Sequence, residues 1–209
     1  MDARRITVVG AGLSQPSSTR LLADRLARAT VARLADDGVP AEVHVIELRD
    51  LAQDITNNLL TGFAAPRLAA AIDRLTSSDG GIFVTPIFTT SYSGLFKSFI
   101  DVLDPDALTG LPVLLGATGG TERHSLALEY AMRPLFSYLH AVVPSTTVYA
   151  ASGDWGSDGD ASTGGLPERI DRAAGELAAL VRVADRSRRL RDPFALPSGF
   201  SPVGGFGAQ

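Results

Sequence analysis

The stretch VVGAGLSQPSSTRLL, residues 8–22, passes from apolar residues through two glycines into four hydroxyl residues and then into a helical pattern. A strand, a tight turn and a helix in this order are typical of the first unit of a doubly wound α/β fold. Hydroxyl groups at the start of a helix are also typical of a phosphate site. The stretch therefore predicts both a fold and a class of ligand.

Two common phosphate motifs do not fit this turn. The dinucleotide fingerprint needs a third glycine where Gln15 stands, and Glu47, which ends the second apolar run, is too far along the chain for its ribose-binding acid. A Walker loop is absent as well, because the turn contains no G-K-[ST]. The remaining segment SQPSST (14–19) can surround a monophosphate with hydroxyls and helix N–H groups, although Ser17 or Ser18 can also act simply as a helix cap.

Outward from this stretch, apolar runs alternate with helical patterns along the chain. Strands are predicted at residues 5–10, 41–48, 80–86, 111–117 and 145–151, and helices near 18–36, 66–77, 94–104, 124–139 and 166–186. Pro134 is expected to bend the fourth of these helices. Alternation of this kind predicts five parallel strands with helices on both faces of the sheet.

Composition favours one α/β domain over residues 1–190. The chain has 209 residues, no cysteine and a formal net charge of −4, which argues against nucleic acid or a membrane surface as a partner. Without thiols, redox chemistry needs a cofactor, and without an export signal or a membrane-spanning run we expect a cytoplasmic enzyme. Residues 191–209 form a Pro/Gly-rich tail, which is either disordered or an arm whose Phe194, Phe200 and Phe206 contact a partner subunit.

Two further loops are expected at the carboxyl edge of the sheet, where ligands of such folds bind. In TPIFTTSYSGLFKSFID (85–101), an apolar strand leads into Thr, Ser and Tyr, and Phe88 and Tyr92 can provide walls for a flat heteroaromatic ring. In GATGGTERH (116–124), Gly119 and Gly120 allow backbone N–H groups to approach the edge of a ring, unless the pair only makes a turn.

Together, the three motifs resemble the NAD(P)H-dependent FMN reductases of flavodoxin-like fold, especially those that serve two-component, luciferase-like flavin monooxygenases. The resemblance covers about residues 5–151. It implies the strand order 2-1-3-4-5, FMN with NADPH or NADH, a homodimer or homotetramer, and a flavin-dependent monooxygenase as a partner. Many relatives have Gly-Ser at the first turn and an arginine among the phosphate hydroxyls, whereas this chain has Gly12-Leu13 and Ser18.

The resemblance also implies a set of FMN-binding residues in each of the three loops. They are Ser14, Gln15, Ser17, Ser18 and Thr19 around the phosphate, Pro86, Ile87, Phe88, Thr89, Tyr92 and Ser93 beside the isoalloxazine, and Thr118, Gly119, Gly120 and His124 at its other edge.

No catalytic acid or base is expected, because hydride transfer to a flavin depends on the cofactor and on orientation. In agreement, SYSG is not a nucleophile elbow, and His44, His124 and His140 lack metal-ligand spacing. His124 either contacts flavin or nicotinamide phosphate, or it caps its helix or packs locally. Two alternatives stay open: a quinone or azo reductase with bound FMN, and a flavodoxin-type electron carrier, which the modest negative charge disfavours.

Overall fold

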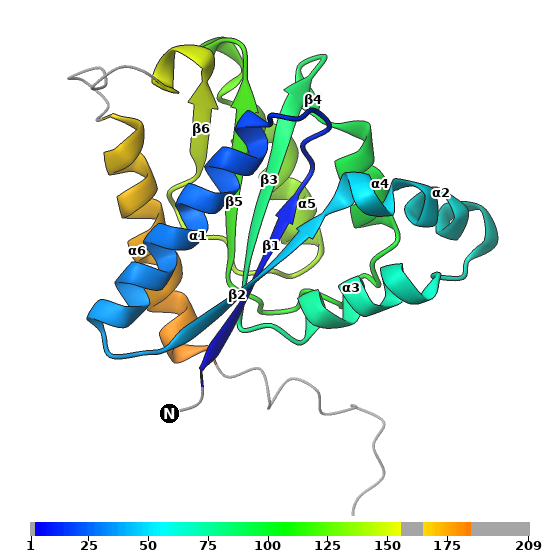
Figure 1. Cartoon of the computed structure of the whole chain (residues 1–209), viewed down its shortest axis with the longest axis horizontal. Helices are drawn as coiled ribbons and strands as arrows, with labels where there is room; N and C mark the ends of the chain where they lie inside the picture. The colour runs from blue at the N-terminus through cyan, green and yellow to red at the C-terminus, as the bar shows by residue number, and fades with distance from the viewer. Residues whose placement is uncertain (1–2, 156–164, 185–209) are drawn as a thin grey trace, which may run out of the picture.

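The central sheet of this computed structural model, which describes residues 3–155 and 165–184, has five parallel strands in the order β2-β1-β3-β5-β6 (Figure 1). These strands are β1 (Arg4–Gly10), β2 (Ala41–Glu47), β3 (Gly80–Phe88), β5 (Val113–Gly119) and β6 (Val148–Ala151). A short strand, β4 (Ser91–Tyr92), pairs antiparallel with the end of β3. Because β5 and β6 are the fourth and fifth parallel strands of the chain, the predicted order 2-1-3-4-5 is confirmed.

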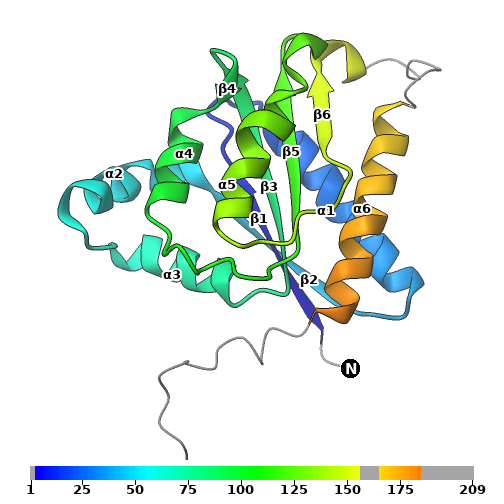
Figure 2. The same cartoon turned by 180° about the vertical axis from the view of Figure 1, so that it is seen from behind.

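Helices cover both faces of the sheet, as the alternating pattern predicted. The helices are α1 (Ser18–Asp36), α2 (Ala52–Thr61), α3 (Pro66–Thr76), α4 (Gly94–Asp101), α5 (Arg133–Tyr138) and α6 (Leu166–Val183). Helices α1 and α6 pack on one face, around Leu22, Leu26 and Leu177, and α3, α4 and α5 lie on the other (Figures 1 and 2). Phe83 and Phe136 are buried on that second face. Two apolar layers explain why the strands read as continuous apolar runs.

The prediction of a single helix over residues 124–139 is wrong. The segment contains the 3-10 turn η2 (Glu122–His124), the π-helical turn η3 (Leu128–Met132) and then α5. Pro134 lies in the first turn of α5, where its missing N–H is tolerated, and the N–H of Arg133 donates to the carbonyl of Leu128, five residues back. Apolar periodicity cannot reveal such a local change in hydrogen-bonding pattern.

Other boundaries also differ from the predictions. The fourth and fifth parallel strands were predicted at 111–117 and 145–151 but occupy 113–119 and 148–151, and the helix predicted to reach 104 ends at Asp101. The turn η1 (Leu48–Leu51) and helix α2, which buries only Ile55, were missed. A last turn, η4 (Ser152–Trp155), follows β6. The predicted tail, 191–209, and the end of the last predicted helix lie outside the described residues.

Among the described residues, no helix has the length and apolarity needed to cross a bilayer.

Candidate functional site

Three loops leave the sheet at its carboxyl edge, at the top of Figure 1. In the sheet register Gly10 of β1 lies beside Val84 of β3, and Pro86 of β3 lies beside Thr118 of β5. The N–H of Ala11 donates to the carbonyl of Val84 over 2.9 Å, which ties the start of the first loop to β3. The three predicted motifs therefore meet at one edge, where ligands of doubly wound sheets bind.

A buried hydroxyl pair joins the first and third loops. Oγ1 of Thr19, in the first turn of α1, lies 2.8 Å from Oγ1 of Thr118, near the end of β5. Both residues are only 2% exposed. The sequence placed Thr19 beside the FMN phosphate and Thr118 beside the isoalloxazine ring. No local signal in the sequence could have shown that the two hydroxyls bond to each other.

The segment predicted to bind the phosphate, residues 14–19, is called the phosphate turn below. It is shaped by close packing between Gly12 and Ser17. A Cβ on Gly12 would overlap Oγ of Ser17 and lie 3.2 Å from Cβ of Thr19. Ser17 caps α1, because its hydroxyl accepts the N–H of Arg20 over 3.2 Å. Ser14 and Ser18 are exposed. No acidic side chain occurs in the first turn of α1 itself, where acidic residues would oppose a bound anion.

Arg20 lies beside the turn but its charge is balanced by two carboxylates. Its guanidinium bonds to Asp24 and to Glu47, each over 2.8 Å. The hydrogen bond to Asp24, followed by that to Glu47, raises the pKa of Arg20. On the other side, the carboxamide of Gln15 faces Arg49, which can donate to its oxygen. The roles of Glu47 and Arg49 at this loop were not predicted from the sequence.

The second loop is a tight hairpin between β3 and β4. Thr89 and Thr90 have φ angles of 48° and 71°, in the left-handed region that β-branched residues avoid. Such conformations cost about 1–3 kcal/mol each and are concentrated at ligand-binding sites. The hairpin leaves Phe88 47% exposed, while the ring of Tyr92 packs 5.8 Å from that of Phe96.

The other residues predicted for this loop are buried. The side chain of Ile87 belongs to the core, and Pro86 is buried beside it, so they can offer a ligand their backbone only. Ser93 is 1% exposed and caps α4 by accepting the N–H of Phe96 over 3.2 Å. Its own N–H donates to Oγ1 of Thr85 over 3.1 Å. Ser93 therefore fixes the far end of the loop.

The third loop is held by Tyr149 of β6. The hydroxyl of Tyr149 donates to the carbonyl of Thr121 over 2.7 Å, and a Cβ on Gly119 would overlap that hydroxyl. Burial, assisted by the charges of Asp154 and Glu122, raises the pKa of Tyr149 and keeps it a donor. Gly120 is exposed at the tip of the loop.

His124, which the prediction placed at the start of a helix, is half-buried at the end of the 3-10 turn η2.

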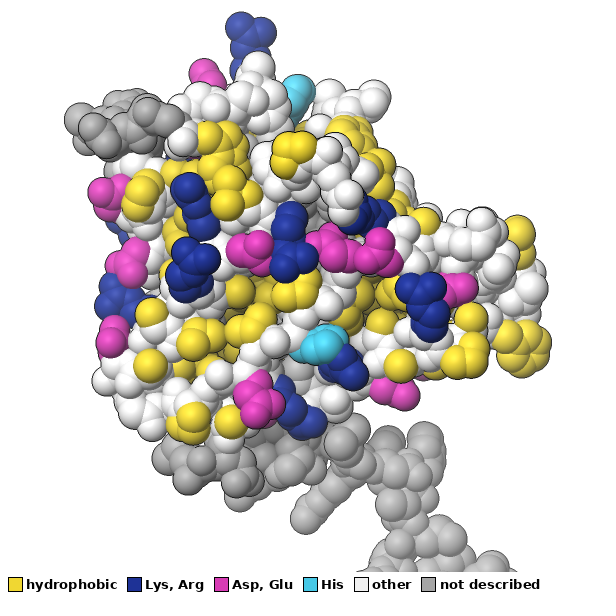
Figure 3. Space-filling view, in the orientation of Figure 1, with side chains coloured by type: hydrophobic (Ala, Val, Ile, Leu, Met, Phe, Trp, Pro, Cys, Tyr) yellow, Lys and Arg dark blue, Asp and Glu magenta, His cyan; other side chains and the backbone are white. Residues whose placement is uncertain are grey.

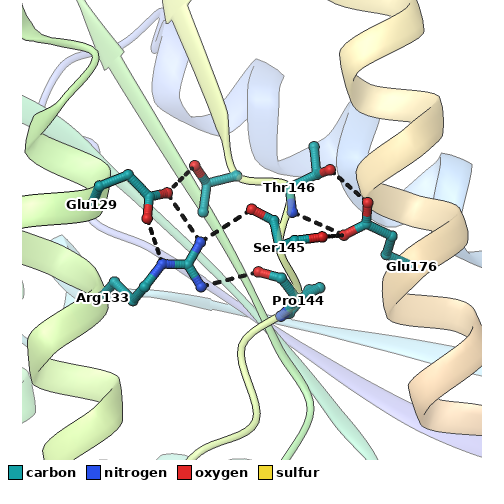
Figure 4. Close-up of polar contacts among 7 residues, drawn as sticks. Glu129, Arg133, Pro144, Ser145, Thr146 and Glu176 are labelled. Atoms are coloured by element: carbon teal, nitrogen blue, oxygen red, sulfur yellow. Dashed lines mark hydrogen bonds and ion pairs between the residues drawn. The ribbon is translucent and has the colours of Figure 1, made fainter.

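A polar network fixes the π-helical turn behind the third loop (Figure 4). Arg133 donates to both carboxylate oxygens of Glu129 and to the carbonyl of Ser145. Glu176 of α6 accepts the N–H of Thr146 over 2.8 Å. The hydrogen bond from Arg133 lowers the pKa of Glu129, against the effect of burial. Burial alone would raise the pKa of Glu176, but hydrogen bonds from Thr146 and Ser145 outweigh it and lower the value.

Two clefts are relevant to the location of the site. The larger, of about 680 Å³, is lined by residues near the amino ends of β1 and β2, such as Arg5 and Glu42, and so lies away from the three loops. A cleft of about 470 Å³ adjoins the phosphate turn and includes Ser14 and Ser17. No cluster of three or more His, Cys, Asp or Glu side chains suited to a metal ion occurs within residues 3–155 and 165–184.

Comparison with known proteins shows the family of this chain. Residues 4–156 match the family described as NADPH-dependent FMN reductase. The chain belongs to this family. Membership confirms the family and the class of activity that the three motifs predicted.

Individual relatives of this reductase span most of its length. It is 38% identical over 151 residues to FMN reductase (NADPH) of Pseudomonas aeruginosa, covering 72% of this chain and 78% of that one. It is 35% identical over 176 residues to NADH-dependent FMN reductase SfnF of Pseudomonas fluorescens, covering 84% and 91%. An oxidoreductase of Corynebacterium diphtheriae has a similar structure, with a TM-score of 0.83 and 45% identity over 88% of this chain and 99% of that one.

Proposed function

We propose that this chain transfers a hydride from NADPH or NADH to FMN bound at the three-loop edge of its sheet. The observation that carries the proposal is the convergence of the loops, fixed by the Thr19–Thr118 hydroxyl pair, on one edge with a phosphate turn free of acidic side chains. The donor set suits FMN, because hydroxyls and helix N–H groups bind a monophosphate without lysine.

Each loop has its own part in holding the flavin. Ser14, Ser17 and Ser18 bind the phosphate together with the N-terminus of α1, while Thr19 fixes the turn through Thr118. Residues 86–89 border the ring through their backbone, with Phe88 and Tyr92 as apolar walls, and Gly119 and Gly120 bring N–H groups to its other edge.

Bound FMN would supply the redox chemistry by accepting the hydride of the nicotinamide. The residues of the chain orient the two partners, and no side chain serves as an acid or base.

The phosphate assignment is tested by comparing FMN with riboflavin, which has the same ring but no phosphate. Replacing both Ser14 and Ser18 by alanine should weaken FMN binding by about a hundredfold or more, because each of the two lost bonds to the phosphate contributes about 1.5–3 kcal/mol. Riboflavin affinity should stay within about twofold in the same calorimetric titrations, because the ring site is untouched. Ser137→Ala, at an exposed position of α5, is the matched control. Equal losses for both flavins, or unchanged FMN affinity, would contradict the assignment.

Turnover tests the reaction itself. NAD(P)H oxidation should be stimulated by free FMN, whereas stimulation by a quinone or azo dye alone would favour a reductase that keeps its flavin. Absence of turnover without a partner reductase would favour an electron carrier.

We also propose that the enzyme is a cytoplasmic homodimer or homotetramer that supplies reduced FMN to a flavin-dependent monooxygenase. Support for self-association comes from three exposed side chains beyond the third loop: Leu126, Tyr130 and Tyr138 are 61%, 80% and 70% exposed. Exposed apolar groups on one segment are typical of interaction surfaces. Light scattering at several protein concentrations tests the assembly, and a monomer throughout would refute it.

A further inference from the structure

Strand β2 forms one edge of the sheet, and this edge is open. In the part of the chain that the structure describes, β1 is the one strand that pairs with β2. Three consecutive residues in the middle of β2, Glu42, Val43 and His44, are exposed. The strand crosses the front of the molecule in Figure 1, and the space-filling view in the same orientation shows a histidine beside a basic side chain on this face (Figure 3). An open edge is a template for pairing with another strand.

The hydrogen-bond pattern shows which backbone groups of β2 point outward. The N–H of Arg4 in β1 donates to the carbonyl of Pro40, just before β2, over 2.8 Å. In a parallel ladder, alternate residues direct their backbone groups to the same neighbour, so those of Glu42 and His44 face β1. The N–H and C=O groups of Val43, and of the residues two positions before and after it, therefore point away from the sheet. Within residues 3–155 and 165–184, these outward groups make no backbone hydrogen bond.

The side chains of β2 differ between the two faces of the strand. Ala41 and Val45 pack against the apolar core beneath α1, and Val43, which points to the same side, is 40% exposed. On the opposite side, the ring of His44 contacts the guanidinium of Arg74 in α3. The open edge therefore has an apolar face and a charged face.

The charges of β2 select one register for pairing with a second copy of the same strand. Across a two-fold axis the two strands run antiparallel, and one residue faces its own copy. A register centred on Glu42 would place two carboxylates opposite each other, and one centred on His44 would bring two Arg74 cations together, which is unfavourable. Registers centred nearer either end of β2 leave part of the exposed stretch unpaired. Centring on Val43 avoids both problems.

The register centred on Val43 is complementary on both faces. Val43 packs on Val43 of the second copy, and the two residues exchange both backbone hydrogen bonds. Glu42 lies directly opposite His44 of the second copy, in a closely spaced pair, and so beside the cation of Arg74. Among the described residues, the carboxylate of Glu42 makes no hydrogen bond or ion pair within its own chain. Neither a proline nor a bulge interrupts residues 41–47.

We propose that β2 pairs antiparallel with β2 of a second copy of this chain, centred on Val43, so that the sheet continues across a two-fold axis. The inference rests on the proposed self-association and names an edge distinct from the surface of Leu126, Tyr130 and Tyr138. Two different two-fold interfaces in one chain generate a tetramer. Because the paired strands run in opposite directions, the carboxyl edges of the two sheets point to opposite ends, which leaves both sets of flavin loops open to substrate.

The register is tested by oxidative cross-linking, because the chain has no cysteine of its own. Val43→Cys should form a disulfide-linked dimer, since the Cα atoms of a hydrogen-bonded antiparallel pair are about 5.5 Å apart, within disulfide range. Glu42→Cys is the matched control, because residues displaced by two positions across the strands are about 7–8 Å apart, and it should not cross-link. Cross-linking of neither variant, of both equally, or of Glu42→Cys alone would overturn the inference.

The mass of the assembly, measured by light scattering, gives an independent test. Val43→Pro removes an outward N–H that makes no backbone hydrogen bond among the described residues, so the fold should persist while the mass is halved. Glu42→Arg and Arg74→Glu should each raise the dissociation constant by about tenfold, because every charge contact occurs twice across the axis, and combining them should restore it. Asp106→Arg, between α4 and β5 and with a side chain 81% exposed, is the control and should change neither quantity.

The outcomes separate this inference from the proposed function. An unchanged mass in Val43→Pro, or a double charge variant no better than the single ones, would overturn the pairing of β2 and leave the FMN site standing. A fall in mass in Tyr130→Ser but not in Val43→Pro would assign assembly to the other surface alone, and would also overturn the inference. A wild-type monomer at all concentrations would refute the inference together with the proposed self-association, whereas flavin titration decides the FMN site separately.

Discussion

The hydroxyl pair between Thr19 and Thr118 permits a quantitative test of how the site is held together. Their oxygens are 2.8 Å apart, and both residues are 2% exposed. Thr19→Val leaves the hydroxyl of Thr118 buried without its partner, which costs about 1–3 kcal/mol, and Thr118→Val does the same to Thr19. For a chain of this size, each kcal/mol lowers Tm by about 2–4 °C.

The double variant should behave differently from the sum of the two changes. Replacing both threonines removes both polar groups, so the loss should be smaller than in either single variant. Chemical denaturation of the flavin-free protein measures all four members of this cycle. Thr56→Val, at an exposed position of α2, is the control and should change stability by less than about 0.5 kcal/mol. Additive losses from Thr19→Val and Thr118→Val would refute the idea that this pair fixes the first loop to the third.

Three other features of the chain lead to predictions. Gly119→Ala should destabilise the protein because its Cβ would overlap the hydroxyl of Tyr149, and adding Tyr149→Phe should recover part of that loss in chemical denaturation; no recovery would contradict the contact. Thr90→Gly should raise stability by about 1 kcal/mol by relieving a positive φ, and a thermal melt with unchanged or lower Tm would argue against strain there. The lowered pKa values of Glu129 and Glu176 mean that their stabilisation is present above the ordinary glutamate pKa of about 4.3 and is lost as the pH falls below it. Glu129→Gln should therefore reduce the fall in the free energy of unfolding at acid pH, as measured by urea unfolding at several pH values. A pH dependence parallel to that of the wild type would contradict this.

Much of the candidate site could be predicted because its signals are local in the sequence. Apolar strands, helical periods and Gly- or hydroxyl-rich turns follow one another along the chain, and the right-handed crossover rule then places the turns at one edge of the sheet. Ser17 illustrates the result: a serine before a helical pattern predicts a cap, and the structure places it there.

Contacts between distant residues could not be predicted in this way. Thr19 and Thr118 are 99 positions apart, and nothing near either residue indicates the other. Glu47 is 37 positions from Gly10 in the sequence, and the parallel register of β1 and β2 brings the two residues side by side. Distance along the sequence does not measure distance across a sheet.

By itself, the sequence determined the layered fold, the strand order implied by family resemblance, and the three loops that face a ligand. These depend on burial patterns and turn chemistry, which neighbouring residues encode. Only the tertiary structure decided how the loops are joined, where the π-helical turn interrupts the fourth predicted helix, and which charged groups form the cleft beside the phosphate turn. Those features depend on side chains and hydrogen bonds that come together only after the sheet has formed.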